Sequence, residues 1–150
     1  MPVPASRAKS HTSAMRFVDT NILLYSISTD RAESAKADIA VELLQSADLA
    51  LSVQVLQEFY VQATHPRRAD ALSGADALAL IATWIRYPVQ ETTTGLMQSA
   101  VAASLRWQIS YWDAAVVEAA RTLGCRQILT EDLNNKQDFG GVVVVNPFVR

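Results

Sequence analysis

The chain has 150 residues, of which 50% are hydrophobic and 19% are charged. This length and composition suit one folded domain with a hydrophobic core, and they exclude a disordered or fibrous protein. The formal net charge of −2 excludes electrostatic attraction of the whole molecule to nucleic acid, so any such contact must be local. The opening residues 1–14 have no apolar periodicity and predict a disordered tail, followed by one domain over residues 15–150.

The absence of long apolar segments predicts a cytoplasmic protein. No apolar run approaches the length that spans a bilayer, and the opening residues lack the apolar core of a secretion signal. The one cysteine, Cys125, cannot form an internal disulfide, and its apolar neighbours favour a small buried thiol in a reducing compartment. Only two histidines are present, His11 and His65, and no spacing of His or Cys resembles a zinc site.

Hydrophobic periodicity predicts short strands that alternate with helices. Period-2 or continuous apolar runs indicate strands, and apolar residues spaced by three and four indicate helices. The predicted strands are residues 16–18, 48–53, 88–91, 126–129 and 142–145, and the predicted helices are residues 31–45, 54–64, 69–86 (one long or two short), 94–107 and 110–124. This alternation predicts an α/β fold with a parallel sheet covered on both faces.

Acidic residues follow two of the predicted strands at the point where each strand ends. Asp19 follows the first strand, and Asp132 follows the apolar run that ends at Leu129. In parallel sheets, ligands gather beyond the carboxyl ends of the strands. Asp113 opens one predicted helix and Glu58 lies in the first turns of another, so both can face the same edge if those helices begin there.

Each of these acids also has an ordinary structural explanation. Asp19 is suited to an Asx turn, and Asp113 stands three residues after Ser110 as the acid of a capping box. Glu58 and Asp132 are compatible with a solvated helix residue and a turn acid. Taken one at a time, these explanations are adequate.

The neighbouring residues favour a shared site instead. Asp19 and Asp113 both lie in apolar surroundings, which would bury a carboxylate unless a cation compensated its charge. Acids brought together repel one another, and a hard divalent cation with oxygen ligands, Mg²⁺ or Mn²⁺, relieves that repulsion.

Four segments carry a resemblance to a known family. They are, in chain order, residues 17–25 (FVDTNILLY), 52–59 (SVQVLQEF), 110–115 (SYWDAA) and 129–133 (LTEDL), with a closing VNPF at 145–148. Together they resemble PIN-domain nucleases of the VapC toxin type, from about Met15 to the C-terminus. One such motif is weak evidence, whereas the ordered set is specific.

The resemblance implies a three-layer α/β/α sandwich with a mainly parallel sheet and an Mg²⁺- or Mn²⁺-dependent ribonuclease. It carries catalysis and metal binding onto Asp19, Glu58, Asp113 and Asp132. It places Thr20, Asn21 and Thr130 as polar supports of the acids or of their water molecules. It further implies a toxin of a toxin-antitoxin pair, held inactive by a small antitoxin in a groove of helices 31–45 and 54–64, and a homodimer formed through the later helices.

An acidic site that attracts RNA needs local positive charge and stacking surfaces. The candidate cations are Arg16, Arg31, Arg67 and Arg68, although solvated loop charges are an equal interpretation. Trp84, Trp107 and Trp112 could stack bases, but their apolar patterns favour packing in the core or an interface.

Three other functions are less compatible with the sequence than a metal-dependent nuclease. A haloacid-dehalogenase-like phosphatase needs a second Asp two residues after the first, and position 21 is Asn. A receiver-like phosphoacceptor domain offers no use for Glu58. The remaining alternative is a catalytically silent module that binds RNA or a protein, but such a scaffold gains nothing from four acids that repel one another.

Overall fold

A five-stranded parallel sheet forms the centre of the molecule. The computed structural model describes residues 15–149, so the tail predicted over residues 1–14 lies outside the described range. The strands occur in the order β3-β2-β1-β4-β5, and all pairs are parallel. Their bounds are β1 (Arg16–Val18), β2 (Leu49–Ser52), β3 (Val89–Gln90), β4 (Gln127–Leu129) and β5 (Val143–Val145).

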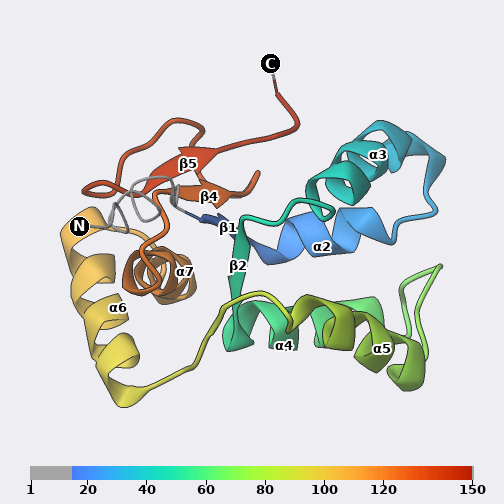
Figure 1. Ribbon diagram of the computed structural model, residues 1–150, viewed down its shortest axis with the longest axis horizontal. Coiled ribbons are helices and arrows are strands. Elements are labelled where there is room, and N and C mark those ends of the chain that lie inside the picture. The colour runs from blue at the N-terminus through green and yellow to red at the C-terminus, as the bar shows by residue number, and fades with distance from the viewer. Residues whose placement is uncertain (1–14, 150) are drawn as a thin grey trace, which may run out of the picture.

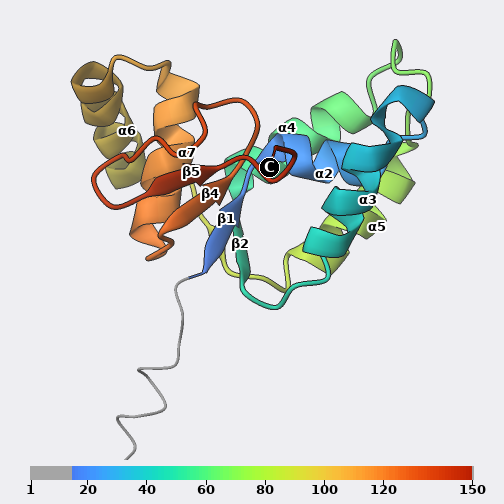
Figure 2. The ribbon, with the colours of Figure 1, turned by 90° about the horizontal axis from the view of Figure 1, so that it is seen from above.

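Helices cover both faces of this sheet, which confirms the predicted α/β/α sandwich. Their bounds are α2 (Thr20–Ser26), α3 (Ser34–Leu43), α4 (Val53–Ala63), α5 (Gly74–Trp84), α6 (Thr94–Trp107) and α7 (Tyr111–Thr122), with a 3₁₀ turn η1 (Arg31–Glu33) before α3. Figures 1 and 2 show α6 and α7 on one side of the sheet and α2, α3, α4 and α5 on the other. Parallel strands need such crossover connections, so both faces are buried.

The core consists of the strands and the inner faces of the helices. Phe17, Ile128 and Val144, from three neighbouring strands, are fully buried. This burial on both faces explains why the strands read as continuous apolar runs. Cys125 is buried as predicted, and burial raises the pKa of its thiol to about 11. Within residues 15–149, no helix is both long enough and apolar enough to cross a membrane.

Two helix starts differ from the predicted ones because polar side chains cap them. Asp30 accepts a hydrogen bond from the Ala32 N–H (2.9 Å), so residues 31–33 form the 3₁₀ turn and α3 begins only at Ser34. Ser73 accepts from the Asp76 N–H (3.0 Å), so the segment 69–86 forms a single helix that starts at Gly74. A cap satisfies an amide of the first turn and thereby sets where a helix begins.

An ion pair joins the starting ends of β1 and β2. The Arg16 guanidinium donates from Nε and Nη2 to the two carboxylate oxygens of Asp48, both at 2.9 Å. The Arg16 N–H also donates to the Asp48 carbonyl oxygen (2.8 Å). This arrangement holds the pKa of Asp48 below its ordinary value.

We expect Asp48→Asn to lower the free energy of unfolding by about 0.2–1 kcal/mol at neutral pH, as for other half-exposed ion pairs. Because the pKa of Asp48 is lower in the folded chain, this stabilisation is present above the unfolded value and is lost as the pH falls through the folded one. Urea unfolding of wild type and variant should therefore differ at pH 7 and converge at acidic pH. Asp38→Asn, at an exposed position of α3, is the control. A difference independent of pH would show that the ion pair is not its source.

Candidate functional site

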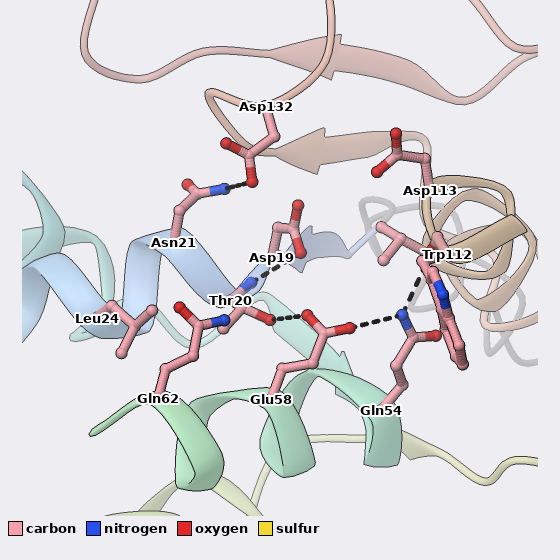
Figure 3. Close-up of a pocket in the computed structure, with 11 residues that line it drawn as sticks. Asp19, Thr20, Asn21, Leu24, Gln54, Glu58, Gln62, Trp112, Asp113 and Asp132 are labelled. Atoms are coloured by element: carbon pink, nitrogen blue, oxygen red, sulfur yellow. Dashed lines mark hydrogen bonds between the residues drawn. The ribbon is translucent and has the colours of Figure 1, made fainter. Parts of the chain in front are cut away.

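A hollow with a largely polar lining lies at the carboxyl ends of β1 and β4. These strands are neighbours at the point where the strand order changes direction, which is where open α/β sheets bind ligands. Figure 3 shows the side chains that line the hollow. All four predicted acids are among them; the full lining is Asp19, Thr20, Asn21, Leu24, Gln54, Glu58, Gln62, Trp112, Asp113, Val116 and Asp132. We call this hollow the acidic pocket.

Asp19 is the most buried acid of the pocket, with 7% of its surface exposed. It is the N-cap of α2, and its Oδ1 accepts a hydrogen bond from the Thr20 N–H (2.8 Å). Its Oδ2 accepts from the hydroxyl of Thr130 (2.8 Å), which is fully buried. Both carboxylate oxygens therefore have a donor, and the side chain is held in one orientation.

Burial raises the pKa of Asp19 to about 6, and repulsion from Asp132 and Glu58 adds to that effect. The hydrogen bonds from Thr20 and Thr130 act in the opposite direction but do not cancel it. A carboxylate with this environment favours either a proton or a nearby cation.

Glu58 reaches the pocket from the second turn of α4. Its Oε2 accepts from the Thr20 hydroxyl (3.0 Å), and its Oε1 accepts from the Gln54 amide (3.0 Å). Gln54, Glu58 and Gln62 are spaced by four residues and therefore share one helix face, which Figure 3 shows turned toward the pocket. Gln54 and Gln62 were not predicted as site residues, although their spacing from Glu58 could have identified them.

Asp132 enters the pocket from the loop after β4. Its Oδ2 accepts from the Asn21 amide (3.0 Å), and its backbone N–H donates to the Thr130 hydroxyl oxygen (3.0 Å). The same Asn21 amide nitrogen donates to the Thr130 hydroxyl oxygen (2.9 Å). Thr20, Asn21 and Thr130, the three polar positions singled out from the sequence, thus each contact at least one of the acids.

Asp113 lies in the first turn of α7, as predicted. The Ser110 hydroxyl accepts from the Asp113 N–H (3.0 Å) and is the N-cap of this helix. In the part of the chain that the structure describes, no hydrogen bond reaches the Asp113 carboxylate. Capping is therefore performed by Ser110 alone, and the Asp113 carboxylate is left facing the pocket (Figure 3).

The chemistry of the pocket suits a hard cation. Its lining contains four carboxylates and no Lys, Arg or His. Oxygen donors of this kind bind Mg²⁺ and Mn²⁺. Within residues 15–149, however, no three acidic, His or Cys side chains are close enough together to hold an ion as they stand. Holding an ion therefore requires the acid side chains to move closer together.

The candidate arginines separate into near and distant positions. Arg16 starts β1, at the opposite end of the strand from Asp19, and is paired with Asp48. Arg31 and Arg67 are exposed and do not line the acidic pocket. Arg68 lines an adjoining hollow that shares Asn21 and Leu24 with the pocket. Of the four candidates, Arg68 is the one beside the acids.

The three tryptophans also occupy different environments. Trp84 is 5% exposed in the core, and Trp107 packs edge-on against Phe139 with ring centroids 5.4 Å apart. Trp112 is 64% exposed and lines the acidic pocket. Trp112 therefore does not pack in the core, because α7 presents it on the outward side of its first turn, next to Asp113; its packing in an interface stays a prediction.

Comparison with known proteins agrees with the fold and the motifs. The family model of the PIN domain matches residues 16–137. The fold resembles Mycobacterium tuberculosis VapC20, a sarcin-ricin loop cleaving toxin (22% identity, TM-score 0.61, covering 78% of this chain and 91% of that one). It also resembles a toxin-antitoxin complex from Klebsiella pneumoniae (21% identity, TM-score 0.62, covering 90% and 98%). The comparison with curated proteins gives no match.

We expect Asp19→Asn to stabilise the metal-free protein. The raised pKa means that ionised Asp19 destabilises the fold, and this cost grows as the pH rises from the ordinary Asp value of 3.8 through about 6. In EDTA, the variant should melt at or above the wild-type temperature, with a larger gain at pH 8 than at pH 5. Asp138→Asn, an exposed acid outside the pocket, is the control. A variant that melts lower at both pH values would contradict the repulsive environment inferred for Asp19.

Proposed function

This chain belongs to the PIN domain family, and from that membership together with its acidic pocket we propose that it is a metal-dependent ribonuclease, the toxin of a toxin-antitoxin pair. The observation that carries the proposal is the convergence of four carboxylates from four separate segments on one pocket that has no positive side chain. A merely structural role for the acids does not account for this convergence, because the charges of Asp132 and Glu58 oppose the ionisation of Asp19.

Asp19, Glu58, Asp113 and Asp132 are the residues that would hold Mg²⁺ or Mn²⁺. When bound, such an ion activates water as a nucleophile and stabilises negative charge on a phosphodiester. The supporting polar residues keep the acids in position for this role: Thr130 holds Asp19, and Asn21 holds Asp132. Fixing the acids before substrate binds reduces the reorganisation required during cleavage.

RNA would approach over Arg68 and Trp112, which lie on different sides of the acids. Arg68, which is paired with Asp70 (Nε–Oδ1 2.7 Å), places a guanidinium in the hollow next to Asn21 and Leu24. The exposed ring of Trp112 offers a flat face on which a base can stack, and such stacking is tolerant of sequence. Because the net charge of the chain is −2, this local arrangement has to replace overall electrostatic attraction.

The partners that we propose are a small antitoxin and a second copy of the chain, in the cytoplasm. The similar structure from Klebsiella pneumoniae is a toxin-antitoxin complex. Helix α2 packs against both α3 and α4. The apolar groove of this part of the molecule lies instead between α4 and α5. This groove is lined by Val53, Leu56, Gln57, Tyr60, Val61 and Ile81.

A separate apolar stripe runs along α6. Met97, Val101 and Leu105 are spaced by four residues and are 42%, 43% and 75% exposed. This spacing places them on one helix face. We assign the groove to an amphipathic antitoxin helix and the stripe to homodimer formation, in line with the expected use of the later helices.

Cleavage of RNA should require both the cation and the Asp113 carboxylate. We expect the purified protein to cut single-stranded RNA in the presence of Mg²⁺ or Mn²⁺ and to be inactive in EDTA. The Asp113→Asn variant should cut the same RNA at least about 100-fold more slowly. The variant should still bind RNA, because Arg68 and Trp112 are unchanged. The measurement is gel analysis of cleaved RNA together with fluorescence anisotropy of bound RNA.

Ser110→Ala is the matched control for this experiment, since it removes the helix cap and leaves the acid. It should cost about 1 kcal/mol of stability and retain most of the cleavage. If the wild-type protein bound RNA but never cut it with either metal, the chain would be the silent binding module instead. If Asp113→Asn cut at the wild-type rate, the four-acid site would be wrong.

The two apolar surfaces can be tested against each other. Val61→Lys, at a position in the groove that is 62% exposed, should prevent co-purification with the co-expressed antitoxin and leave the homodimer intact. Leu105→Lys, on the α6 stripe, should produce a monomer that still binds the antitoxin. Pull-down measures antitoxin binding, and light scattering after size exclusion measures the oligomeric state. The opposite pattern would mean that the surfaces have been assigned the wrong way round.

A further inference from the structure

Two adjacent acids in the loop after β4 point to different places, one into the acidic pocket and one away from it. Asp132 lines the acidic pocket and contacts Asn21, whereas Glu131 is absent from the pocket lining and extends toward α2 and α3. Figures 1 and 2 show these two helices next to each other, on the side of the sheet opposite α6 and α7. Glu131 is thus an acid beside the site that is kept out of it.

Tyr25 and Lys36 hold Glu131 in this position. The Tyr25 hydroxyl donates to Oε1 of Glu131, and the Lys36 ammonium donates to Oε2 at 2.8 Å. Lys36 also donates to the Tyr25 hydroxyl oxygen (3.3 Å). The three side chains therefore contact one another pairwise, and we call them the Glu131 clamp.

Aromatic packing orients the clamp. The Lys36 ammonium lies 5.0 Å from the ring centroid of Tyr25 and 5.5 Å from that of Phe148. These two rings pack edge-on with their centroids 5.0 Å apart. The cation is therefore placed by two aromatic faces as well as by the carboxylate, which restricts the rotamers of a long side chain.

The clamp and the acidic pocket share helix α2. Asn21 and Tyr25 are one turn apart on this helix and therefore lie on the same face. Asn21 contacts the loop through Asp132 and accepts from the Glu131 N–H (3.4 Å), while Tyr25 contacts it through the Glu131 side chain. The short loop that carries Asp132 is fastened to α2 at two successive turns.

We propose that Lys36 is a positioning residue for Asp132, acting through Glu131 and Tyr25. It keeps the Glu131 carboxylate outside the pocket and sets the direction in which Asp132 points, so that the acids can close on a divalent cation. This inference rests on the proposed metal-dependent function. Polar partners that orient metal ligands typically change metal affinity by about 10- to 100-fold when they are removed.

The test is Lys36→Met, which retains much of the aliphatic side chain and removes the charge. Mn²⁺ binding, measured by calorimetry without RNA, should weaken by about tenfold, and the Mg²⁺ concentration for half-maximal cleavage should rise in parallel. Because the Lys36 side chain is 42% exposed, the melting temperature should change by no more than a few degrees. Lys136→Met, at an exposed lysine outside the clamp, should change none of these.

Two further variants distinguish positioning from a general loss of stability. Tyr25→Phe removes only the hydroxyl and should weaken Mn²⁺ binding in the same direction. The double variant Lys36→Glu with Glu131→Lys reverses the ion pair and should recover part of the lost affinity. If the wild type binds Mn²⁺ and Lys36→Met binds it equally well, the inference is overturned while the proposed function stands. If the wild type neither binds the ion nor cuts RNA, the proposed function itself fails.

Discussion

Burial of the Asp19 carboxylate in a pocket without a positive side chain is the constraint on which the rest of the site depends. Asp19 is nearly buried, and the negative charges of Asp132 and Glu58 oppose its ionisation. A fold keeps such an arrangement only when the surrounding structure prevents the acids from moving apart. Here β1 and β4, which are buried on both faces, carry Asp19 and the Asp132 loop. Donors from Thr20, Asn21 and Thr130 then fix the acids.

The parallel sheet explains why residues far apart in the chain meet at this pocket. The carboxyl ends of parallel strands lie at one edge, and helices that start at that edge bring their first turns to it. Thus β1 delivers Asp19, the β4 loop delivers Asp132, and α4 and α7 deliver Glu58 and Asp113. The Ser110 hydroxyl caps α7, so the Asp113 carboxylate is not needed as a cap and faces the pocket.

The features of the fold and the site that depend on local sequence pattern could be predicted from the sequence. Strand ends, helix faces and the four motifs placed the acids at one edge, and the structure brings all of them to one pocket. Features that depend on packing between distant segments could not be predicted. The exposure of Trp112, the pairing of Arg16 with Asp48, and the apolar groove between α4 and α5 all depend on which helices and strands become neighbours. Hydrophobic periodicity identifies an apolar face but not the element that covers it.

Glu131 and Asp132 illustrate this limit most clearly, because the sequence shows only two consecutive acids. Both have the donor chemistry for a hard cation, and either could face the pocket. Their hydrogen-bond partners determine which acid faces the pocket. The Asn21 amide keeps Asp132 in the pocket, while the Tyr25 hydroxyl and the Lys36 ammonium hold Glu131 outside it. A free second carboxylate at this position would add to the repulsion on Asp19. The positive charge of Lys36 therefore pairs with Glu131 next to the acidic pocket and does not enter it. The space among the acids is left for a cation.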